Sequence, residues 1–267
     1  MSVLASIIDK SISGSFSHSA GIVGDYAFYH CNNLTSVSFS NARHIGASAF
    51  AGCKSLTRAT GSNVTSIDTN AFDGCANLTE VNFPRVISIG KEAFEACAKL
   101  TEVPFSDVVS ISDYAFYGCT GLTSVSLSKV MTISARAFAA CTSLTSVSFP
   151  FSSSIAEAAF LNCTSLTSVS FPIVTNIGNG AFGNCTSLTS ASFPNVTKIG
   201  TEAFSGCGGL TSISVGTNMT TVCKLSGTNA FKNCSNLVDI YVPASLVDSY
   251  KSATNWSSYA DKIKAAS

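Results

Sequence analysis

Cysteine is the residue type with the greatest chemical potential in this chain, because thiolates bind metals, attack carbonyls and form disulfides. The 267-residue sequence holds 11 cysteines, and all but Cys223 follow an Ala-Phe pair by three residues. No two cysteines lie two to four residues apart, so the spacing of a zinc site is missing. The sequence therefore predicts a column of buried thiols acting as small apolar side chains, with disulfides between neighbours as the alternative. The column comprises Cys31, Cys53, Cys75, Cys97, Cys119, Cys141, Cys163, Cys185, Cys207 and Cys234.

The remaining residues suggest no catalytic centre and no cofactor. Cys223 lies outside the cysteine column, and we expect its thiol to be the most exposed and reactive. His30 precedes Cys31, but the pattern supplies no third group that would orient the imidazole of a nucleophilic pair. His18 and His44 are the only other histidines, and no phosphate-binding loop, nucleophile elbow or metal-ligand motif occurs. We expect a protein without enzymatic activity.

The cysteines belong to a 22-residue unit that repeats through most of the chain. The Phe of the Ala-Phe pair recurs every 22 residues from Phe28 to Phe204, and a tenth copy, Phe231, follows after 27. One unit cannot bury its own apolar face, whereas stacked units form a continuous core. The period therefore predicts a solenoid with one coil per unit.

Each part of the unit predicts a local structure. In Leu-Thr-Ser-Val-Ser-Phe, apolar residues alternate with serine, which is typical of a strand with one buried face. A Val and an Ile three residues apart predict a second, shorter extended segment. The Ala-Phe segment fits one helical or 3₁₀ turn. The glycine after the Ile is expected to supply a turn with positive φ; it is found at Gly46, Gly90, Gly178 and Gly200.

Over residues 22–243 the repeat resembles the BspA-like leucine-rich repeats, whose units read Ile-Gly-x-x-Ala-Phe-x-x-Cys-x-x-Leu. With the period, the resemblance implies a right-handed leucine-rich-repeat coil with a parallel β-sheet on one face and short strands with 3₁₀ turns on the other. It also implies a microbial surface or secreted protein that adheres to host or neighbouring-cell proteins. The ladder-forming asparagine of commoner leucine-rich repeats is absent, and we expect the second Val/Ile segment to satisfy the turn backbone instead. Valine occupies its column, at Val64, Val86, Val108, Val130, Val174 and Val196.

The sequence divides the chain into three parts. Residues 1–21 match the repeat loosely and predict an N-terminal cap, and residues 22–243 hold ten repeats with a surface insertion near 223–227. Residues 244–267 predict a C-terminal helical cap of two short helices, broken near 253–255. Their apolar sides would carry Leu246, Val247, Tyr250, Trp256, Tyr259 and Ile263.

Charge and hydropathy exclude several classes of partner. The chain has 15 basic and 15 acidic residues, whereas nucleic-acid binding favours a basic surface. No stretch approaches 18 consecutive apolar residues, so no membrane span is expected. The first residues lack the basic and then apolar pattern of a secretory signal. We expect a monomer that binds protein.

The outward side chains of the Ser-Val-Ser strands form the candidate recognition surface. Most are serines; Thr60 and Pro104 are exceptions, and the other exceptions are the candidate binding residues Arg58, Glu80, Asn82, Glu102, Asp239 and Tyr241. Glu80 and Glu102 should lie stacked near Arg58, which would offset their mutual repulsion. Three functions remain open: a scaffold that binds a protein or glycan, a structural spacer with few contacts, and adhesion of the serine array to ice or another crystal surface.

Overall fold

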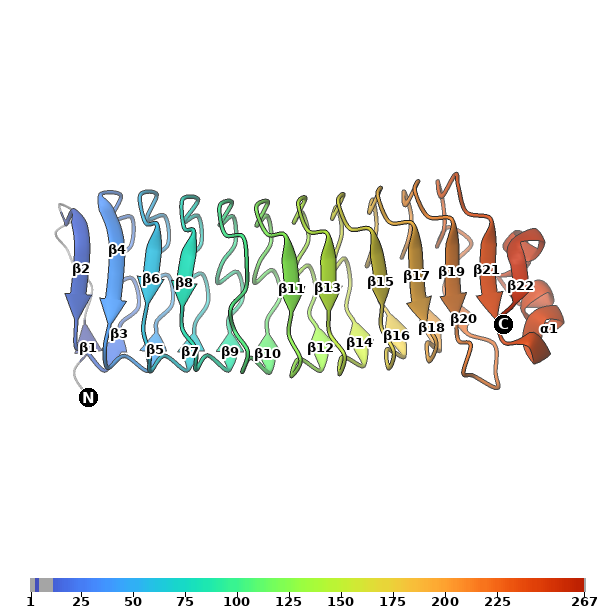
Figure 1. Ribbon diagram of the computed structural model, residues 1–267, viewed down its shortest axis with the longest axis horizontal. Helices are drawn as coiled ribbons and strands as arrows, with labels where there is room; N and C mark the ends of the chain where they lie inside the picture. The colour runs from blue at the N-terminus through green and yellow to red at the C-terminus, as the bar shows by residue number, and fades with distance from the viewer. Residues whose placement is uncertain (1–2, 5–11, 267) are drawn as a thin grey trace.

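Two rows of parallel strands run the length of the molecule, and successive coils stack side by side (Figure 1). The computed structural model describes residues 3–4 and 12–266. Of the cap predicted for residues 1–21, residues 1–2 and 5–11 lie outside this description. Strands in each row pair at the repeat period, so that Val125 lies opposite Val147 and Ile133 opposite Ile155. The predicted solenoid with a parallel sheet is confirmed.

The longer strands contain the Ser-Val-Ser segments. Their central residues, such as Val37 and Val169, point into the core, and the flanking residues face outward. They are β2 (Gly14–His18), β4 (Leu34–Phe39), β6 (Arg58–Thr60), β8 (Glu80–Asn82), β11 (Ser124–Ser126), β13 (Ser146–Ser148), β15 (Ser168–Ser170), β17 (Ser190–Phe193), β19 (Ser212–Val215) and β21 (Asp239–Val242).

The shorter strands form the second row, as the Val/Ile segments predicted. Each from β3 onward buries its second residue, as Ile67 and Ile199 do. They are β1 (Val3–Leu4), β3 (Ile22–Val23), β5 (His44–Ile45), β7 (Ser66–Ile67), β9 (Ser88–Ile89), β10 (Ser110–Ile111), β12 (Thr132–Ile133), β14 (Ser154–Ile155), β16 (Asn176–Ile177), β18 (Lys198–Ile199) and β20 (Lys224–Leu225).

The row of longer strands is interrupted at the coil that contains Pro104. The described strands pair as β2-β4-β6-β8, and after a segment without strand pairing at Glu102–Pro104 they pair as β11-β13 and then, after a second break, as β15-β17-β19-β21. Pro104 stands where β8 has Asn82, and proline has no backbone N–H to donate to a ladder. The core continues across this interruption, because the rings of Phe94 and Phe116 still stack at 5.3 Å.

The Ala-Phe turns differ in part from the predicted helical or 3₁₀ turn. In the first of them, the Tyr29 N–H donates to the Tyr26 carbonyl, an i→i−3 bond of the 3₁₀ kind. Tyr26 and His30, however, both have φ of 57°, and such left-handed residues prevent a continuous helix. The Phe28 N–H instead donates to the carbonyl of Ala49 in the next coil, at 2.7 Å. The backbone N–H groups of the turn therefore donate alternately to carbonyls of their own coil and of the next coil.

The prediction of positive φ at the glycines after Ile is wrong. Gly46, Gly90, Gly178 and Gly200 are absent from the positive-φ residues of the described chain. A Cβ at Gly90 would lie 2.6 Å from the carbonyl carbon of Asp68, and one at Gly178 would lie 2.5 Å from that of Ala156. Glycine is needed there because the backbone of the preceding coil approaches so closely.

A stack of phenylalanine rings fills the centre of the solenoid. From Phe28 to Phe231, the rings of successive coils lie 5.0–5.7 Å apart, with planes within 1–11° of parallel. Fully burying one such side chain contributes about 1.5–3 kcal/mol. Each ring thus stabilises its own coil and the contact with the next.

The cysteine column forms a ladder of hydrogen bonds between coils, which the sequence did not predict. Each thiol donates to the carbonyl of the core phenylalanine one coil earlier, so that Cys53 bonds to Phe28 and Cys119 to Phe94. The Sγ···O distances are 3.0–3.2 Å. The thiols therefore donate to turn carbonyls, whereas the sequence predicted that the Val/Ile segment would satisfy the turn backbone. The donors are Cys53, Cys75, Cys97, Cys119, Cys141, Cys163, Cys185, Cys207 and Cys234.

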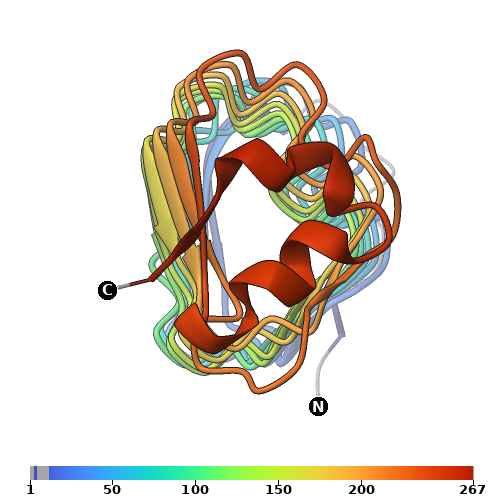
Figure 2. The same ribbon diagram turned by 90° about the vertical axis from the view of Figure 1, so that its right-hand side faces the viewer.

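A C-terminal cap covers the last coil (Figure 2). It consists of a 3₁₀ turn, η1 (Ala244–Leu246), the helix α1 (Val247–Ser252), a second 3₁₀ segment, η2 (Ser257–Lys262), and the strand β22 (Ile263–Ala265). The cap contains one short α-helix where two were predicted, since the second helical segment is 3₁₀ and Ile263 lies in β22 and not in a helix. Because β22 pairs in parallel with β21, the chain adds one last strand to the sheet.

The insertion lies mainly before residue 223 and is held by the cap. Nine positions separate Val215 from Lys224, whereas five separate their partners Phe193 and Lys198. The Cys223 N–H donates to the Tyr250 hydroxyl at 2.9 Å. The Trp256 indole N–H donates to the Cys223 carbonyl at 2.6 Å. The cap therefore holds the end of this segment at Cys223, and the segment is not the free surface loop that the sequence predicted.

We expect replacement of a mid-ladder cysteine to destabilise the solenoid. Cys119→Ala removes a buried thiol and leaves the Phe94 carbonyl with one donor fewer, which should cost about 1–2 kcal/mol of unfolding free energy. Urea denaturation measures this cost. Ser124→Ala changes an exposed residue of the next strand and should stay within about 0.5 kcal/mol of the wild type. Equal stability of Cys119→Ala and the wild type would contradict the ladder.

The cap contact should control access to Cys223. Trp256→Phe keeps an aromatic ring but removes the donor to the Cys223 carbonyl, so it should lower the free energy of unfolding by about 1–2 kcal/mol. Alkylation of Cys223 under native conditions, mapped by mass spectrometry, should accelerate. Ser257→Ala, an exposed change beside the tryptophan, is the control. An unchanged alkylation rate in Trp256→Phe would show that the indole does not close this segment.

Candidate binding surface

The cysteine thiols are unsuited to nucleophilic or metal chemistry. Burial raises the pKa of the Cys53, Cys119 and Cys163 thiols to about 12, so the reactive thiolate is scarce at neutral pH. Within the described residues no group of three or more histidine, cysteine or acidic side chains could hold a metal ion. The column cysteines from Cys31 to Cys207 are fully buried thiols, as predicted.

The expectation that Cys223 is exposed and reactive is wrong. Its side chain is buried under the cap, and burial raises the pKa of its thiol to about 12. The sequence placed Cys223 outside the repeat, but it did not show that the cap aromatics would bind this segment. Cys234 is instead the one described cysteine that is only partly buried.

The histidines occupy turns and strand ends. His18 accepts a hydrogen bond from the Ala20 N–H at Nδ1, and the Nδ1 of His44 lies 2.8 Å from the Ser66 hydroxyl. The His30 ring packs edge-on against Tyr29 at 4.2 Å and lies over Gly52. Cys31 is fully buried, whereas His30 lies half-buried at the surface of the turn. This arrangement favours a structural role for His30.

The outward face of the longer strands carries the predicted binding residues. Arg58 on β6 and Glu80 on β8 are direct cross-strand neighbours, and Arg58 Nε lies 3.3 Å from Glu80 Oε1. Their side chains are 57% and 51% exposed, so the pair is open to a partner. Asn82, on the same strand as Glu80, lines a shallow hollow of about 370 Å³ together with Arg58 and Thr60. Arg58, Glu80 and Asn82 therefore lie together and form one patch.

Arg58 pairs with Glu80 and not with Glu102, so the predicted offset of both glutamate charges by Arg58 is not observed. Glu102 is exposed in the interrupted segment beyond β8, and it makes no ion pair with any residue of the described chain. Arg58 and Glu80 pair directly because their strands are adjacent, whereas Glu102 lies one coil further along. Its carboxylate is therefore an unneutralised charge at the edge of the patch.

Asp239 and Tyr241 lie together on β21 at the other end of the face. The Tyr241 hydroxyl donates to Asp239 Oδ2 at 2.9 Å, and Lys264 Nζ lies 2.5 Å from Asp239 Oδ1. The hydrogen bonds from Lys264 and then Tyr241 lower the pKa of Asp239, and the carboxylate in turn raises the pKa of Tyr241. Sequence reasoning missed Lys264, because it assigned the last residues to a helix and not to a strand beside β21.

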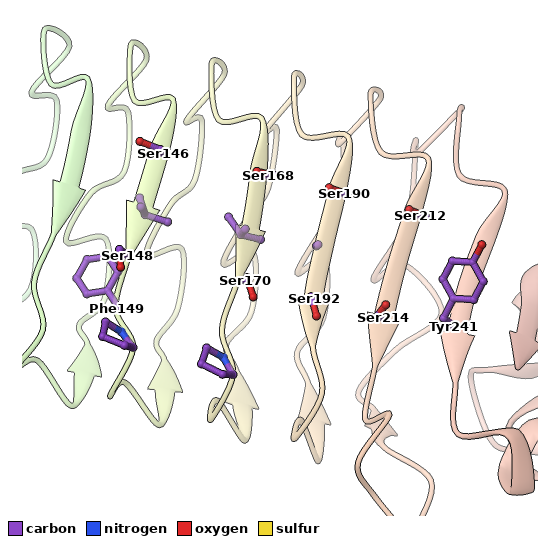
Figure 3. Close-up of a pocket in the computed structure, with 15 residues that line it drawn as sticks. Ser146, Ser148, Phe149, Ser168, Ser170, Ser190, Ser192, Ser212, Ser214 and Tyr241 are labelled. Carbon is purple, nitrogen blue, oxygen red and sulfur yellow. The ribbon is translucent and has the colours of Figure 1, made fainter. Parts of the chain in front are cut away.

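A shallow groove of about 590 Å³ crosses the serine-rich half of the face (Figure 3). Paired serines line it on β13, β15, β17 and β19, and Tyr241 on β21 ends the row. Threonines just before these strands are structural, since Thr145 and Thr189 each donate to a threonine carbonyl one coil earlier. The face thus offers many hydroxyl groups but few large side chains.

The chain belongs to the family described as the BspA type leucine rich repeat region. That family matches over residues 10–110, 43–167 and 153–259, with six copies of the repeat. The match covers nearly all of the solenoid, so the sequence resemblance is confirmed. No helix within residues 3–4 and 12–266 has the length and apolar character needed to cross a bilayer.

Solved structures with a similar fold come from several bacteria. The pneumococcal vaccine antigen PcpA is 15% identical, with a TM-score of 0.54, over 100% of this chain and 85% of that one. A leucine-rich repeat protein of T. pallidum is 29% identical over 70% and 76% of the chains, with a TM-score of 0.49. A leucine rich cell surface protein of Faecalibacterium prausnitzii is 22% identical over 95% and 88%, with a TM-score of 0.43. A search of curated proteins finds no match.

The raised thiol pKa values predict a loss of stability in alkali. Thiols in the unfolded chain titrate near pH 9, whereas folded ladder thiols such as Cys119 titrate near 12. The unfolded state therefore loses its protons first, and the unfolding free energy should fall as the pH rises from about 9 towards 12. Urea midpoints at about pH 7, 9 and 10 measure the slope. Cys119→Ala removes one such thiol and should reduce the slope; an identical slope would contradict this origin.

Proposed function

We propose that this protein is a non-enzymatic scaffold that binds a protein partner through the outward face of its longer strands. We also propose that it acts as a microbial surface or secreted protein in adhesion to host or neighbouring-cell proteins. Membership of the BspA type family supports both statements. The geometry that supports binding is a long, uncovered row of parallel strands whose inward positions repeat and whose outward positions depart from serine in a few coils.

The observation that carries the proposal is the charged patch of Arg58, Glu80, Asn82 and Glu102. An exposed ion pair such as Arg58–Glu80 contributes about 0–1 kcal/mol to the stability of the fold, so stability does little to explain why these charges are present. Most other coils place serine at these positions. Charges that cross an interface give specificity and steer association, which is the role that we assign to this patch.

Asp239 and Tyr241 form a second polar group on the same face, at its C-terminal end. The neighbouring edge strand β22 has three residues and carries the exposed Lys264. A short edge strand with an outward lysine disfavours pairing with another sheet. We therefore propose that the scaffold acts as a monomer and binds its partner on the face and not through this edge.

A structural spacer remains the second candidate, because serines dominate most of the face. Small uncharged side chains supply few of the aromatic and arginine contacts that dominate binding energies. A spacer would hold another domain away from a surface without retaining a ligand. The charged patch separates the two functions, since only a recognition surface depends on its charges.

A double charge exchange tests the recognition role. Arg58→Glu combined with Glu80→Arg preserves the net charge and the ion pair but reverses its direction, so the fold should be unaffected. Partners retained by the wild type at physiological salt from host-cell and bacterial surface extracts are identified and purified, and their affinities are measured. We expect the exchange to weaken binding at least about tenfold. The matched control is Ser168→Ala with Ser190→Ala, on the same face.

Two results would contradict the scaffold function. Retention of no partner by the wild type would favour the spacer. Equal affinity of the wild type and the charge-exchanged variant would remove the patch from the binding site. Thermal unfolding of all variants confirms that any difference arises at the surface, because the exchanged side chains lie outside the core.

A further inference from the structure

A second hollow lies at the C-terminal end of the exposed face, where the sheet, the insertion and the cap meet. Its volume is about 730 Å³. It adjoins the serine groove, because Ser192, Ser214 and Tyr241 line both hollows. Thr217 and Asn218 of the insertion bound one side of it, and Pro243 and Ala244 at the start of the cap bound another. We call it the Tyr241 hollow.

Tyr241 is the only aromatic side chain in the two outward columns of the longer strands. Its column holds serine on most strands, for example Ser170, Ser192 and Ser214. The ring lies on β21 beside the serines of β19 (Figure 3). Its hydroxyl is held by Asp239, which is in turn held by Lys264. The ring is therefore preorganised, and binding does not have to order a free side chain.

The chemistry of the lining favours a neutral, hydroxyl-rich ligand. Ser192, Ser214, Thr217 and Asn218 offer hydroxyl and amide groups without charge. The nearby charges of Asp239 and Lys264 neutralise each other in one ion pair. An aromatic platform beside hydroxyl and amide groups suits a sugar ring, whose C–H face stacks on the aromatic ring while its hydroxyls form hydrogen bonds.

A peptide strand fits this place less well than a sugar does. β21 is paired with β19 on one side and with β22 on the other, so its backbone offers no free edge for an added strand. The hollow also lacks a large apolar pocket for a side-chain anchor, since its apolar residues are mainly proline and alanine.

We propose that the Tyr241 hollow binds a neutral saccharide, with one pyranose ring stacked on Tyr241 and the rest of the chain directed into the serine groove. The groove continues across β19, β17, β15 and β13, and each strand presents a pair of serines. An extended glucan crossing these strands would meet hydroxyl groups at each step. This site is independent of the charged patch at Arg58 and does not require the protein-binding function.

Titration of the full chain with cellotetraose, an extended neutral glucan, tests the proposal by amide-resolved NMR. We expect shifts at Ser214 and at the side-chain amide of Asn218, with a dissociation constant of roughly 1 mM, as suits a shallow site with one aromatic platform. Maltotetraose tests whether a helical glucan binds as well. Binding of either glucan at these residues supports the saccharide site.

Two substitutions separate stacking from folding. Tyr241→Ser introduces the residue that most other coils carry in this column, so the fold should be retained, and affinity should fall roughly five- to tenfold. Tyr241→Phe keeps the ring and should retain affinity within about threefold. Thr60→Ala lies in the same column at the other end of the face and should have no effect.

The absence of shifts with both glucans, up to their solubility limits, would overturn the proposal. Wild-type affinity in Tyr241→Ser would overturn it as well, because the ring would then not be the platform. Shifts centred on Arg58 and Thr60 would assign the sugar to the other end of the face and likewise contradict the Tyr241 hollow. None of these results depends on the protein partner, so the proposed scaffold function is tested separately.

Discussion

Stacking of coils at one constant period is the constraint on which the whole molecule depends. A phenylalanine ring can lie parallel to its neighbours at 5.0–5.7 Å only if each coil returns the chain to the same place. The same return brings each thiol within 3.0–3.2 Å of a carbonyl one coil earlier. A coil one residue longer must therefore place its extra residue outside these contacts. The insertion before Cys223 does so, and the cap holds it in place.

The thiol ladder explains why cysteine occupies a position where a simple apolar residue would fill the same space. The carbonyl of Phe94 accepts from the N–H of Cys97 in its own turn and from the thiol of Cys119 in the next coil. Aliphatic side chains at these positions would leave such buried carbonyls with a single donor. The thiol is small, tolerates an apolar core and still donates a weak hydrogen bond. Burial also keeps it protonated, so the same environment that needs a donor suppresses its reactivity.

The period determined most of the fold, because every coil solves the same packing problem. The solenoid, both rows of strands and the outward columns followed from the spacing of Phe28, Cys31 and Leu34 and their copies. Features produced by a contact between unlike segments did not follow from it. The burial of Cys223 depends on Trp256 and Tyr250, and the pairing of Lys264 with Asp239 depends on a strand that was hidden within helix-like spacing. Of the candidate patch, the Arg58–Glu80 pair and the place of Glu102 one coil further along follow from the period, but the loss of strand pairing at Glu102–Pro104 was not predicted.

Departures from the repeat are informative because the core tolerates so few of them. Pro104 interrupts strand pairing, yet it leaves the phenylalanine stack intact, so the outer face can vary where the interior cannot. The variable outward residues gather near the two ends of the face, at Arg58 and Glu80 and at Asp239 and Tyr241. Between them lies a surface of small, uncharged serine side chains, each of which supplies little binding energy. With the two proposed sites at opposite ends of the face, the continuous phenylalanine stack between them would set the distance between their ligands.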